Sequence, residues 1–301
     1  MKLINGLIAA VFTPFDADGE IDLTVIGPYA EKLIADRADG VFVCGTTGEC
    51  PSMTVKERKT VLEEWIKAVH GRMLVIAHVG GTCQKDCAEL AVHAQEVGAD
   101  AIGSVPPYYF KPQNVDCLVE FFRPVAAAAP KLPFYYYHIP SVTGVSFDMT
   151  AFLEKGAAAI PTLAGIKFTG TDFMAMSKCV CYEDGRFNIL NGFDEMLLSG
   201  LVSGAQGGVG STYNYAFPVY RNIMNAFAAG DIETARFWQR RSIDVVDVIV
   251  RHGGGVRGGK AMMKAIGIDC GNCRSPFAPF TAAEMDAVDS ELKAIDFDSI
   301  K

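Results

Sequence analysis

Short apolar segments alternate with longer segments of helical periodicity through most of this chain, and this alternation constrains the fold more than any other feature. The apolar segments have the length and composition of buried parallel strands. In the longer segments, apolar residues recur at intervals of three and four, as on one face of a helix. Strands are expected at residues 7–11, 40–43, 74–78, 101–105, 134–137, 163–167, 187–190 and 206–209, and helices at 24–35, 54–69, 85–97, 115–128, 149–154, 172–181, 195–203 and 217–229.

Eight consecutive strand–helix pairs predict an α/β fold, the parallel (β/α)8 TIM barrel, because roughly 230 residues is the size expected of that fold. A doubly wound open sheet is the competing fold, but its first strand is usually followed by a glycine-rich dinucleotide turn, and this chain has Phe12-Thr13-Pro14 there. Beyond residue 230 only helices are predicted, at 232–252, 258–266 and 281–295. We therefore expect a barrel that carries the active site over residues 1–230 and a helical extension packed on it over residues 231–301.

Composition and charge exclude several classes of protein. The 301 residues are 50% hydrophobic, which suffices for a large core, and carry a net charge of -8 without any run rich in Lys or Arg. A nucleic-acid-binding or anionic-membrane-binding surface is therefore not expected. The apolar stretch near the N-terminus is interrupted by Thr13, Pro14 and Asp16, so it is too short for a membrane span and is expected to be a buried strand. These features predict a cytoplasmic protein.

Three further patterns do not indicate a site. The nine cysteines are scattered and predict reduced core thiols, and the pair Cys270 and Cys273 lacks the additional ligands of a zinc site, which favours a plain turn. Residues 254–260, GGVRGGK, have the spacing of a phosphate-binding loop, but Ala261 stands where Ser or Thr is needed and a predicted helix precedes it. We interpret this segment as a glycine-rich break between helices. The five histidines show no catalytic partner spacing and are expected to be structural.

Polar residues follow five of the predicted strands. They are CGTTGE after the second strand, YHIP after the fifth, GIKFTG at the sixth, NGFDE after the seventh and GVGSTYN after the eighth. In a parallel barrel the carboxyl ends of the strands converge on one mouth, so these motifs are expected to lie together.

Lys167, in GIKFTG, is the first candidate catalytic residue. Strand alternation places Lys167 and Thr169 on one face of the strand and Phe168 on the other. If Phe168 packs against the helices, Lys167 points into the barrel. An amine kept neutral there can attack a ketone carbon to form an imine, whereas the alternative is an ion pair at the barrel mouth.

Two more motifs fit such chemistry. In FYYYHIP, Tyr135 and Tyr137 share a face, and a phenol beside an imine can transfer protons to and from a substrate hydroxyl. An ordinary core aromatic is the alternative for Tyr137. In GTTGE, the backbone and the hydroxyls of Thr46 and Thr47 suit a carboxylate, and Glu49 is expected to brace the loop.

Taken together and in this order, GTTGE, YHIP, GIKFTG, NGFDE and GGVGSTYN closely resemble the motifs of the pyruvate-dependent class I aldolases, the family that includes dihydrodipicolinate synthase and N-acetylneuraminate lyase. The resemblance covers essentially the whole chain. The synthases have an arginine two residues after the proline of the tyrosine motif, where this chain has Val142. The lyase branch has the glycine, aspartate and glutamate after strand seven and the STYN segment, and this chain has both.

The resemblance implies a reaction. Lys167 would form an imine with C2 of open-chain N-acetylneuraminate, and Tyr137 would help to remove the proton of the C4 hydroxyl while the C3–C4 bond breaks. Pyruvate and N-acetylmannosamine are the implied products. The iminium serves as electron sink, so no metal or organic cofactor is implied, and the partners are small molecules rather than nucleic acid or membrane. The implied contacts are Thr46 and Thr47 to the pyruvyl carboxylate, and Thr169, Gly192, Asp194, Glu195 and Ser211 to the sugar hydroxyls.

Tyr109, in PPYYFKP, matches a family tyrosine that reaches the site of a neighbouring subunit, which implies a homo-oligomer, usually a homotetramer. Two alternatives stay open. An aldolase of the same family for another 2-keto-3-deoxy sugar acid would use the same Lys167 and Tyr137. A non-catalytic paralogue that binds a keto acid would not need both residues, so their joint presence favours an enzyme.

Overall fold

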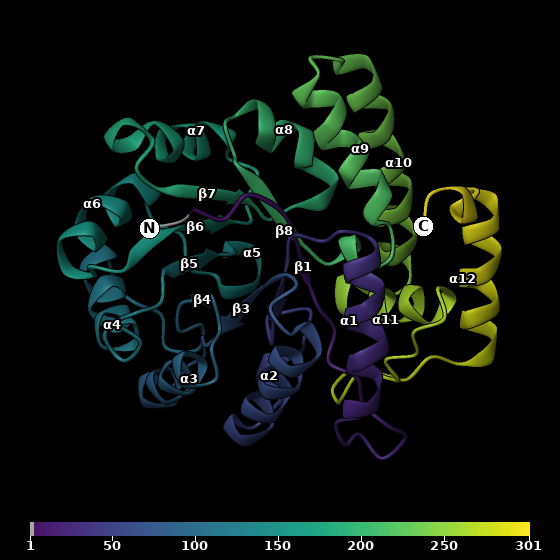
Figure 1. The fold of residues 1–301 in the computed structure, drawn as a ribbon, viewed down its shortest axis with the longest axis horizontal. Coiled ribbons are helices and arrows are strands. Elements are labelled where there is room, and N and C mark those ends of the chain that lie inside the picture. The colour runs from purple at the N-terminus through teal and green to yellow at the C-terminus, as the bar shows by residue number, and fades with distance from the viewer. Residues whose placement is uncertain (1–2) are drawn as a thin grey trace.

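The computed structural model describes residues 3–301 and contains a closed barrel of parallel strands, which confirms the predicted fold class (Figure 1). Each strand pairs with the next one along the chain, and the last strand pairs with the first. Every predicted strand end lies within one residue of the observed one. The strands are β1 Gly6–Ala10, β2 Gly40–Val43, β3 Leu74–His78, β4 Ala101–Ser104, β5 Phe134–His138, β6 Leu163–Phe168, β7 Asn188–Asn191 and β8 Gly207–Gly210.

Helices surround the barrel as its outer layer (Figure 1). Thr54 illustrates how local sequence starts them: its hydroxyl accepts the Glu57 backbone N–H, and the Glu57 carboxylate accepts the Thr54 N–H, a complete capping box. The surrounding helices are α1 Ile26–Ala35, α2 Val55–Val69, α3 Gln84–Glu96, α4 Val115–Ala127, α6 Met149–Ala159, α7 Phe173–Cys181, α8 Leu197–Val202 and α9 Phe217–Ala228. A short helix that the sequence did not predict, α5 Pro140–Thr143, follows β5. Single 3-10 turns lie at Leu23–Val25, Cys50–Ser52, Tyr182–Gly185, Asp194–Met196, Thr212–Asn214 and Phe297–Ser299.

Strand alternation divides the core into two layers. Ile166 and Phe168 of β6 belong to the apolar layer between strands and helices, together with Tyr136 of β5. Phe42 and Tyr137 belong to a separate cluster inside the barrel. The two-residue period of β6 therefore points Lys167 into the barrel interior, as the sequence predicted.

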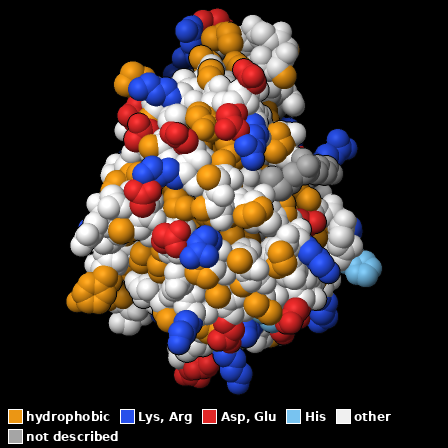
Figure 2. All heavy atoms as spheres, turned by 90° about the vertical axis from the view of Figure 1, so that its left-hand side faces the viewer, with side chains coloured by type: hydrophobic (Ala, Val, Ile, Leu, Met, Phe, Trp, Pro, Cys, Tyr) orange, Lys and Arg blue, Asp and Glu red, His pale blue; other side chains and the backbone are white. Residues whose placement is uncertain are grey.

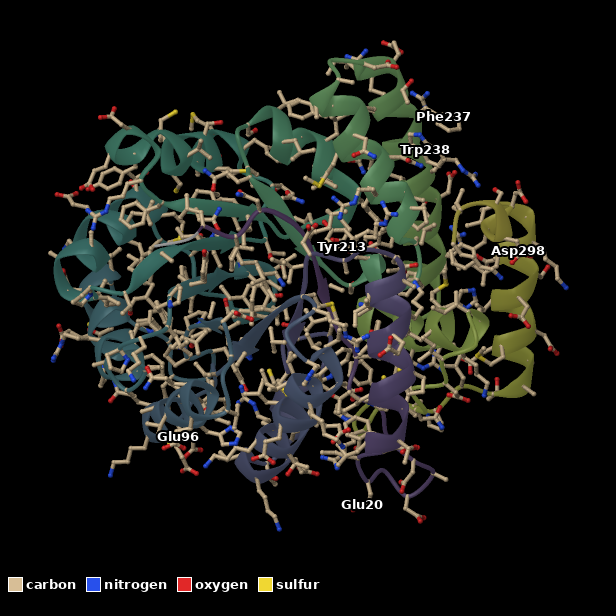
Figure 3. All side chains as sticks on the ribbon, viewed as in Figure 1. Glu20, Glu96, Tyr213, Phe237, Trp238 and Asp298 are labelled. Atoms are coloured by element: carbon tan, nitrogen blue, oxygen red, sulfur yellow. The ribbon has the colours of Figure 1, made fainter. Side chains whose placement is uncertain are left out.

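Three further helices follow the barrel in the described chain: α10 Ile232–Arg251, α11 Gly254–Ala265 and α12 Ala282–Ala294. Helix α10 packs against α9 and α11, and Figure 1 places α12 at the outer edge, away from the strands. Figure 3 shows Phe237 and Trp238 on the outer side of α10, whereas Tyr213 lies inside, beside β8. The predicted division of the chain at residue 230 into a barrel and an extension stays a prediction.

One sequence interpretation of this region is wrong. Residues 254–260 form the first turns of α11 rather than a break between helices, and the turn is confined to the preceding residues. The glycines allow this helix to pack closely against other segments of the chain. A Cβ on Gly258 would lie 2.5 Å from the Ile249 carbonyl oxygen, and one on Gly259 would lie 2.4 Å from the Phe12 ring. Glycine spacing alone does not distinguish a loop from a tightly packed helix.

The face of the molecule that Figure 2 shows agrees with the charge argument. On the face shown in Figure 2, acidic and basic side chains are interspersed, with apolar side chains scattered between them. No helix within residues 3–301 combines the length and apolar character needed to cross a membrane. All nine cysteines are free thiols, as predicted, although Cys83, Cys117 and Cys181 are exposed rather than in the core.

His138, at the end of β5, gives a prediction about acid stability. Burial lowers the pKa of His138 to about 4, and the ring packs against Phe168 and Tyr136 while Nδ1 has no partner among the described residues. Between pH 6.5 and 4 the unfolded chain therefore binds a proton that the folded chain does not, so the free energy of unfolding falls as the pH drops. Between pH 7 and pH 4.5 the free energy of unfolding should fall by about 2 kcal/mol less in His138→Phe than in the wild type. Urea unfolding at both pH values measures this difference. Replacement of the exposed His70 by Asn should not change the fall, and equal acid sensitivity of His138→Phe and wild type would contradict the prediction.

Candidate active site

A cavity of about 340 Å3 lies at the carboxyl ends of the strands. Residues from β5, β6 and the segments after β2, β7 and β8 line it, so the motifs that are far apart in the sequence meet at one mouth. With one exception, every site residue predicted from the sequence lines this cavity: Thr46, Thr47, Tyr137, Lys167, Thr169, Gly192, Asp194, Glu195 and Ser211. The exception is Tyr109, which lies 78% exposed on the segment between β4 and α4, away from the cavity of its own chain.

Lys167 occupies the centre of the site on β6. Its side chain is 5% exposed, and Nζ lies 3.9 Å from the ring centroid of Tyr137 and 4.8 Å from that of Phe42. Among residues 3–301, no side chain or carbonyl forms a hydrogen bond or ion pair with Nζ. The ion pair considered from the sequence is therefore not formed by the described residues, and the amine stands free beside two aromatic faces.

Tyr137 lies next to Lys167 in the sheet, since these two residues are register partners of β5 and β6. The hydroxyl oxygen of Tyr137 lies 3.4 Å from Oγ1 of Thr46. Its neighbour Tyr136 points outward and packs against Phe122 and Phe152, as expected for a core aromatic. Tyr137 thus lines the cavity, whereas the adjacent Tyr136 belongs to the core between the strands and the helices.

The loop after β2 contributes hydroxyl groups to the cavity. Thr46 and Thr47 line the cavity, whereas Glu49 turns away from it. Glu49 instead pairs with Lys260 of α11, with 2.8 Å between Oε1 and Nζ. The expected bracing role of Glu49 agrees with this contact.

Two acidic residues face the cavity from the turn after β7. Asp194 is buried, and its Oδ2 accepts hydrogen bonds from the Thr212 backbone N–H at 2.9 Å and from the Thr212 hydroxyl at 2.6 Å. Its Oδ1 has no partner among the described residues. Gly210 on β8 makes room for this carboxylate, because a Cβ there would lie 1.5 Å from Oδ1. The free oxygen is thus a buried acceptor at the cavity wall.

Burial raises the pKa of the Asp194 carboxyl, although the hydrogen bonds from Thr212 lower it. Burial also raises the pKa of Glu195, and its backbone hydrogen bond acts in the opposite direction. Buried carboxylates are stabilised by hydroxyl donors, because each hydrogen bond from a hydroxyl replaces one from water that burial has removed. This wall of the cavity therefore suits a ligand rich in hydroxyl groups.

The apolar part of the cavity wall was not predicted from the sequence. Val142 comes from α5, Val246 and Val250 come from α10, and Val256 comes from the first turn of α11. The helices beyond residue 230 thus help to form a site that the sequence assigned to the barrel alone. An amphipathic pattern shows which helical face is apolar, but it does not show what that face contacts.

Known proteins resemble this chain in sequence and in fold. A family model described as the dihydrodipicolinate synthetase family matches residues 3–295. The N-acetylneuraminate lyase of Mus musculus is 42% identical over 300 residues, which is 98% of this chain and 94% of the mouse protein. The structure of the Proteus mirabilis N-acetylneuraminate lyase has a TM-score of 0.95 and 40% identity, and the match covers 98% of this chain and 100% of that chain.

A structure of the Ruminococcus gnavus sialic acid aldolase, described as a catalytic lysine mutant, has a TM-score of 0.92 and 29% identity, over 97% of this chain and 96% of that chain. The resemblance identified from the five motifs is thereby confirmed. Because the family model spans nearly all of the sequence and close relatives match it over almost their full length, this chain belongs to the dihydrodipicolinate synthetase family.

Proposed function

We propose that this protein is a class I aldolase that reversibly cleaves N-acetylneuraminate to pyruvate and N-acetylmannosamine through an imine on Lys167. The observation that carries the proposal is the placement of the Lys167 amine: it has no hydrogen-bond or ion-pair partner among the described residues, lies 3.9 Å from the Tyr137 ring centroid, and shares its cavity with Asp194 and Glu195. The names of the mouse and Proteus relatives, both N-acetylneuraminate lyases, support the same substrate.

In this reaction the Lys167 amine attacks C2 of the open-chain substrate, and loss of water gives an iminium ion. Tyr137 accepts the proton of the C4 hydroxyl. The electron pair of the C3–C4 bond then moves into the iminium, which leaves an enamine and releases N-acetylmannosamine as an aldehyde. Protonation at C3 and hydrolysis of the imine release pyruvate and restore the amine. The protein supplies the electron sink itself, through Lys167.

The remaining residues bind two different parts of the substrate. Thr46 and Thr47 bind the pyruvyl carboxylate, and the 3.4 Å contact between Thr46 and Tyr137 supports a link between this carboxylate site and the proton transfer. Thr169, Gly192, Asp194, Glu195 and Ser211 bind the hydroxyl groups of the sugar part. A hydroxyl-rich sugar is best recognised by buried acceptors, because a wrong substrate would leave them unpaired.

The direct test is pyruvate release from N-acetylneuraminate by the purified protein, without added metal and with a chelator present. Steady release supports the lyase reaction. Release only from another 2-keto-3-deoxy sugar acid would retain the aldolase mechanism and change the substrate. If no substrate is cleaved and borohydride traps no pyruvate adduct on Lys167, the protein is a binding paralogue rather than an enzyme.

Asp194→Asn tests the sugar-binding role separately. We expect the KM for N-acetylmannosamine in the condensation direction to rise by about 10- to 100-fold, because a hydrogen bond to a buried carboxyl oxygen is lost. The KM for pyruvate should change little, because Asp194 does not contact the carboxylate site. Steady-state kinetics with each substrate varied in turn measure both values, and an equal rise in the two would argue against a sugar-specific role.

We also propose a homotetramer in the cytoplasm. Tyr109 and Phe110 are 78% and 86% exposed and stack edge to face at 5.1 Å, and an exposed aromatic pair of this kind suits a contact with another copy of the chain. Tyr109 would then reach the site of its neighbour. Light scattering coupled to size exclusion is expected to give the mass of four chains, and a monomer mass would reject this assembly.

A further inference from the structure

Two residues with left-handed backbone bracket the loop that carries Thr46 and Thr47. Cys44 has a φ of 57° and Glu49 a φ of 56°. A residue with a side chain is strained in this region, and the strain persists only where the surroundings hold the backbone. The conformation of this loop therefore depends on contacts from outside it.

The first end of the loop is held from inside the barrel. His78 Nδ1 lies 2.8 Å from the Cys44 carbonyl oxygen, and the Val105 backbone N–H donates to His78 Nε2 at 3.3 Å. These two contacts assign the single proton of a neutral ring to Nδ1, which donates to Cys44. Burial and the nearby Arg58 guanidinium keep the pKa of His78 well below its usual range, so the ring stays neutral.

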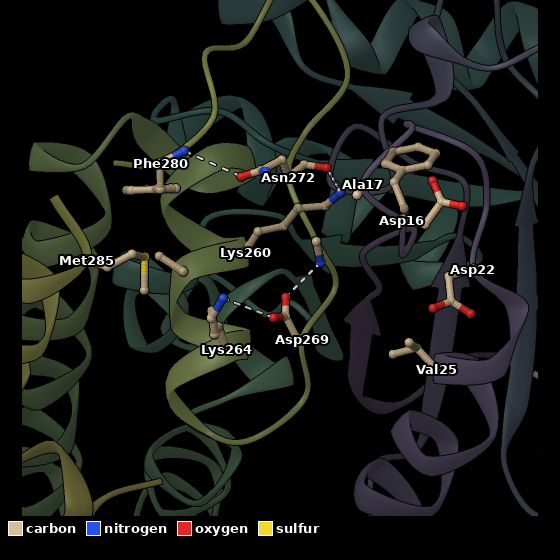
Figure 4. A pocket seen from close by; sticks show the side chains of 13 residues that line it. Asp16, Ala17, Asp22, Val25, Lys260, Lys264, Asp269, Asn272, Phe280 and Met285 are labelled. Atoms are coloured by element: carbon tan, nitrogen blue, oxygen red, sulfur yellow. Dashed lines mark hydrogen bonds and ion pairs between the residues drawn. The ribbon is translucent and has the colours of Figure 1, made fainter. Parts of the chain in front are cut away.

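The second end is held by α11 and by the segment that follows this helix. The Glu49 carboxylate pairs with Lys260 of α11 at 2.8 Å, and these side chains are only 1% and 2% exposed. The other carboxylate oxygen accepts the Arg274 backbone N–H at 2.9 Å. Lys260 also donates to the Asn272 carbonyl oxygen at 3.0 Å, as Figure 4 shows, and its Nζ lies 4.3 Å from the Phe15 ring centroid. Loss of either partner would leave an uncompensated buried charge.

None of Glu49, Lys260 and Arg274 lines the active-site cavity. These residues can therefore influence a bound substrate only indirectly, through the backbone of the segments that they join. Helix α11 also reaches the cavity wall with Gly255 and Val256. The buried ion pair thus joins the loop that carries Thr46 and Thr47 to the helix that forms part of the cavity wall.

We propose that Lys260 is a positioning residue for substrate binding: through its buried ion pair with Glu49, it holds the loop that presents Thr46 and Thr47 to the substrate carboxylate. This inference rests on the proposed function for the role of the two threonines. The carboxylate is bound both before and during the chemical step, so a loosened loop weakens binding without slowing bond cleavage.

The test measures borohydride trapping of pyruvate on Lys167 over a range of pyruvate concentrations, with intact mass as the readout. For Lys260→Met we expect the half-saturating pyruvate concentration to rise about tenfold, while trapping at saturation stays complete, because a displaced contact weakens binding without removing the amine. In the condensation reaction, the KM for pyruvate should rise and the KM for N-acetylmannosamine should not. A general loss of stability would not separate the two substrates.

The chain offers a matched control on the same helix. Lys264, one turn after Lys260, pairs with Asp269 at 3.0 Å, but these side chains are 57% and 55% exposed (Figure 4). Lys264→Met also removes a lysine and its ion pair from α11. It should leave the half-saturating pyruvate concentration unchanged, because this exposed pair does not contact the loop.

A second variant covers the case in which Lys260→Met does not fold. Glu49→Gln combined with Lys260→Met removes both charges, so no unpaired ion stays buried, and circular dichroism checks its fold. The inference is overturned if a folded variant keeps the half-saturating concentration within about twofold of wild type. It also fails if neither variant folds, because the pair is then a requirement of the fold. Absence of any trapped adduct in the wild type would instead reject the proposed function, which separates the two failures.

Discussion

Lys167→Ala is expected to abolish cleavage of N-acetylneuraminate, with a loss on the order of 10⁴-fold or more, because the variant has no amine to form the imine. The fold should be retained. Nζ has no hydrogen-bond or ion-pair partner within residues 3–301, so its removal leaves no buried polar group unpaired. Pyruvate release in a continuous assay measures the activity, and thermal unfolding checks the fold.

Lys167→Arg separates the nucleophile from the positive charge. The guanidinium stays charged and cannot form the imine, so we expect this variant to be as inactive as Lys167→Ala. Lys178→Ala, which removes an exposed lysine of α7, should retain full activity. Measurable turnover by Lys167→Ala, above that of a mock preparation, would rule out the imine mechanism.

Tyr137→Phe is expected to lower kcat for cleavage by about 10²- to 10⁴-fold, because it removes the group that accepts the C4 hydroxyl proton while the ring beside Lys167 is kept. Imine formation needs the amine but not this proton transfer. Borohydride should therefore still trap pyruvate on Lys167 in this variant. The combination of lost cleavage and retained trapping distinguishes a proton-transfer role from a role in positioning the amine.

Tyr136→Phe is the matched control, since it makes the same change one residue earlier on the same strand. The Tyr136 hydroxyl is buried between the strands and the helices and has no partner among the described residues, so its removal should leave kcat unchanged. If Tyr137→Phe cleaves at the rate of Tyr136→Phe, the proton acceptor must be another group.

Much of this architecture follows from local pattern. The period of two in residues 163–168 placed Lys167 and Phe168 on opposite faces, because successive side chains of a strand point to opposite sides. The polar motifs after five strands predicted a shared mouth, because the carboxyl ends of all parallel strands in a barrel meet there. Nine of the ten predicted site residues line one cavity for this reason.

Other features could not be predicted from the local sequence pattern. Helix α5 is too short to show a helical period, and the glycines of α11 were misread because they pack against Ile249 of another helix and against Phe12 near the start of the chain. The function of Tyr109 depends on a second chain, so it stays a prediction. Nothing near Glu49 in the sequence indicates that its partner is Lys260, more than two hundred residues away.

The sequence by itself determined the barrel, the inward face of each strand and the chemical character of the strand ends, because these depend on backbone geometry that repeats within a few residues. Only the tertiary structure decided that α10 and α11 line one part of the cavity and that Lys260 pairs with Glu49 at the end of the loop that carries Thr46 and Thr47. Those contacts join segments from opposite ends of the chain. They form because buried apolar faces must cover each other and a buried charge must find a partner, conditions that the folded molecule satisfies as a whole.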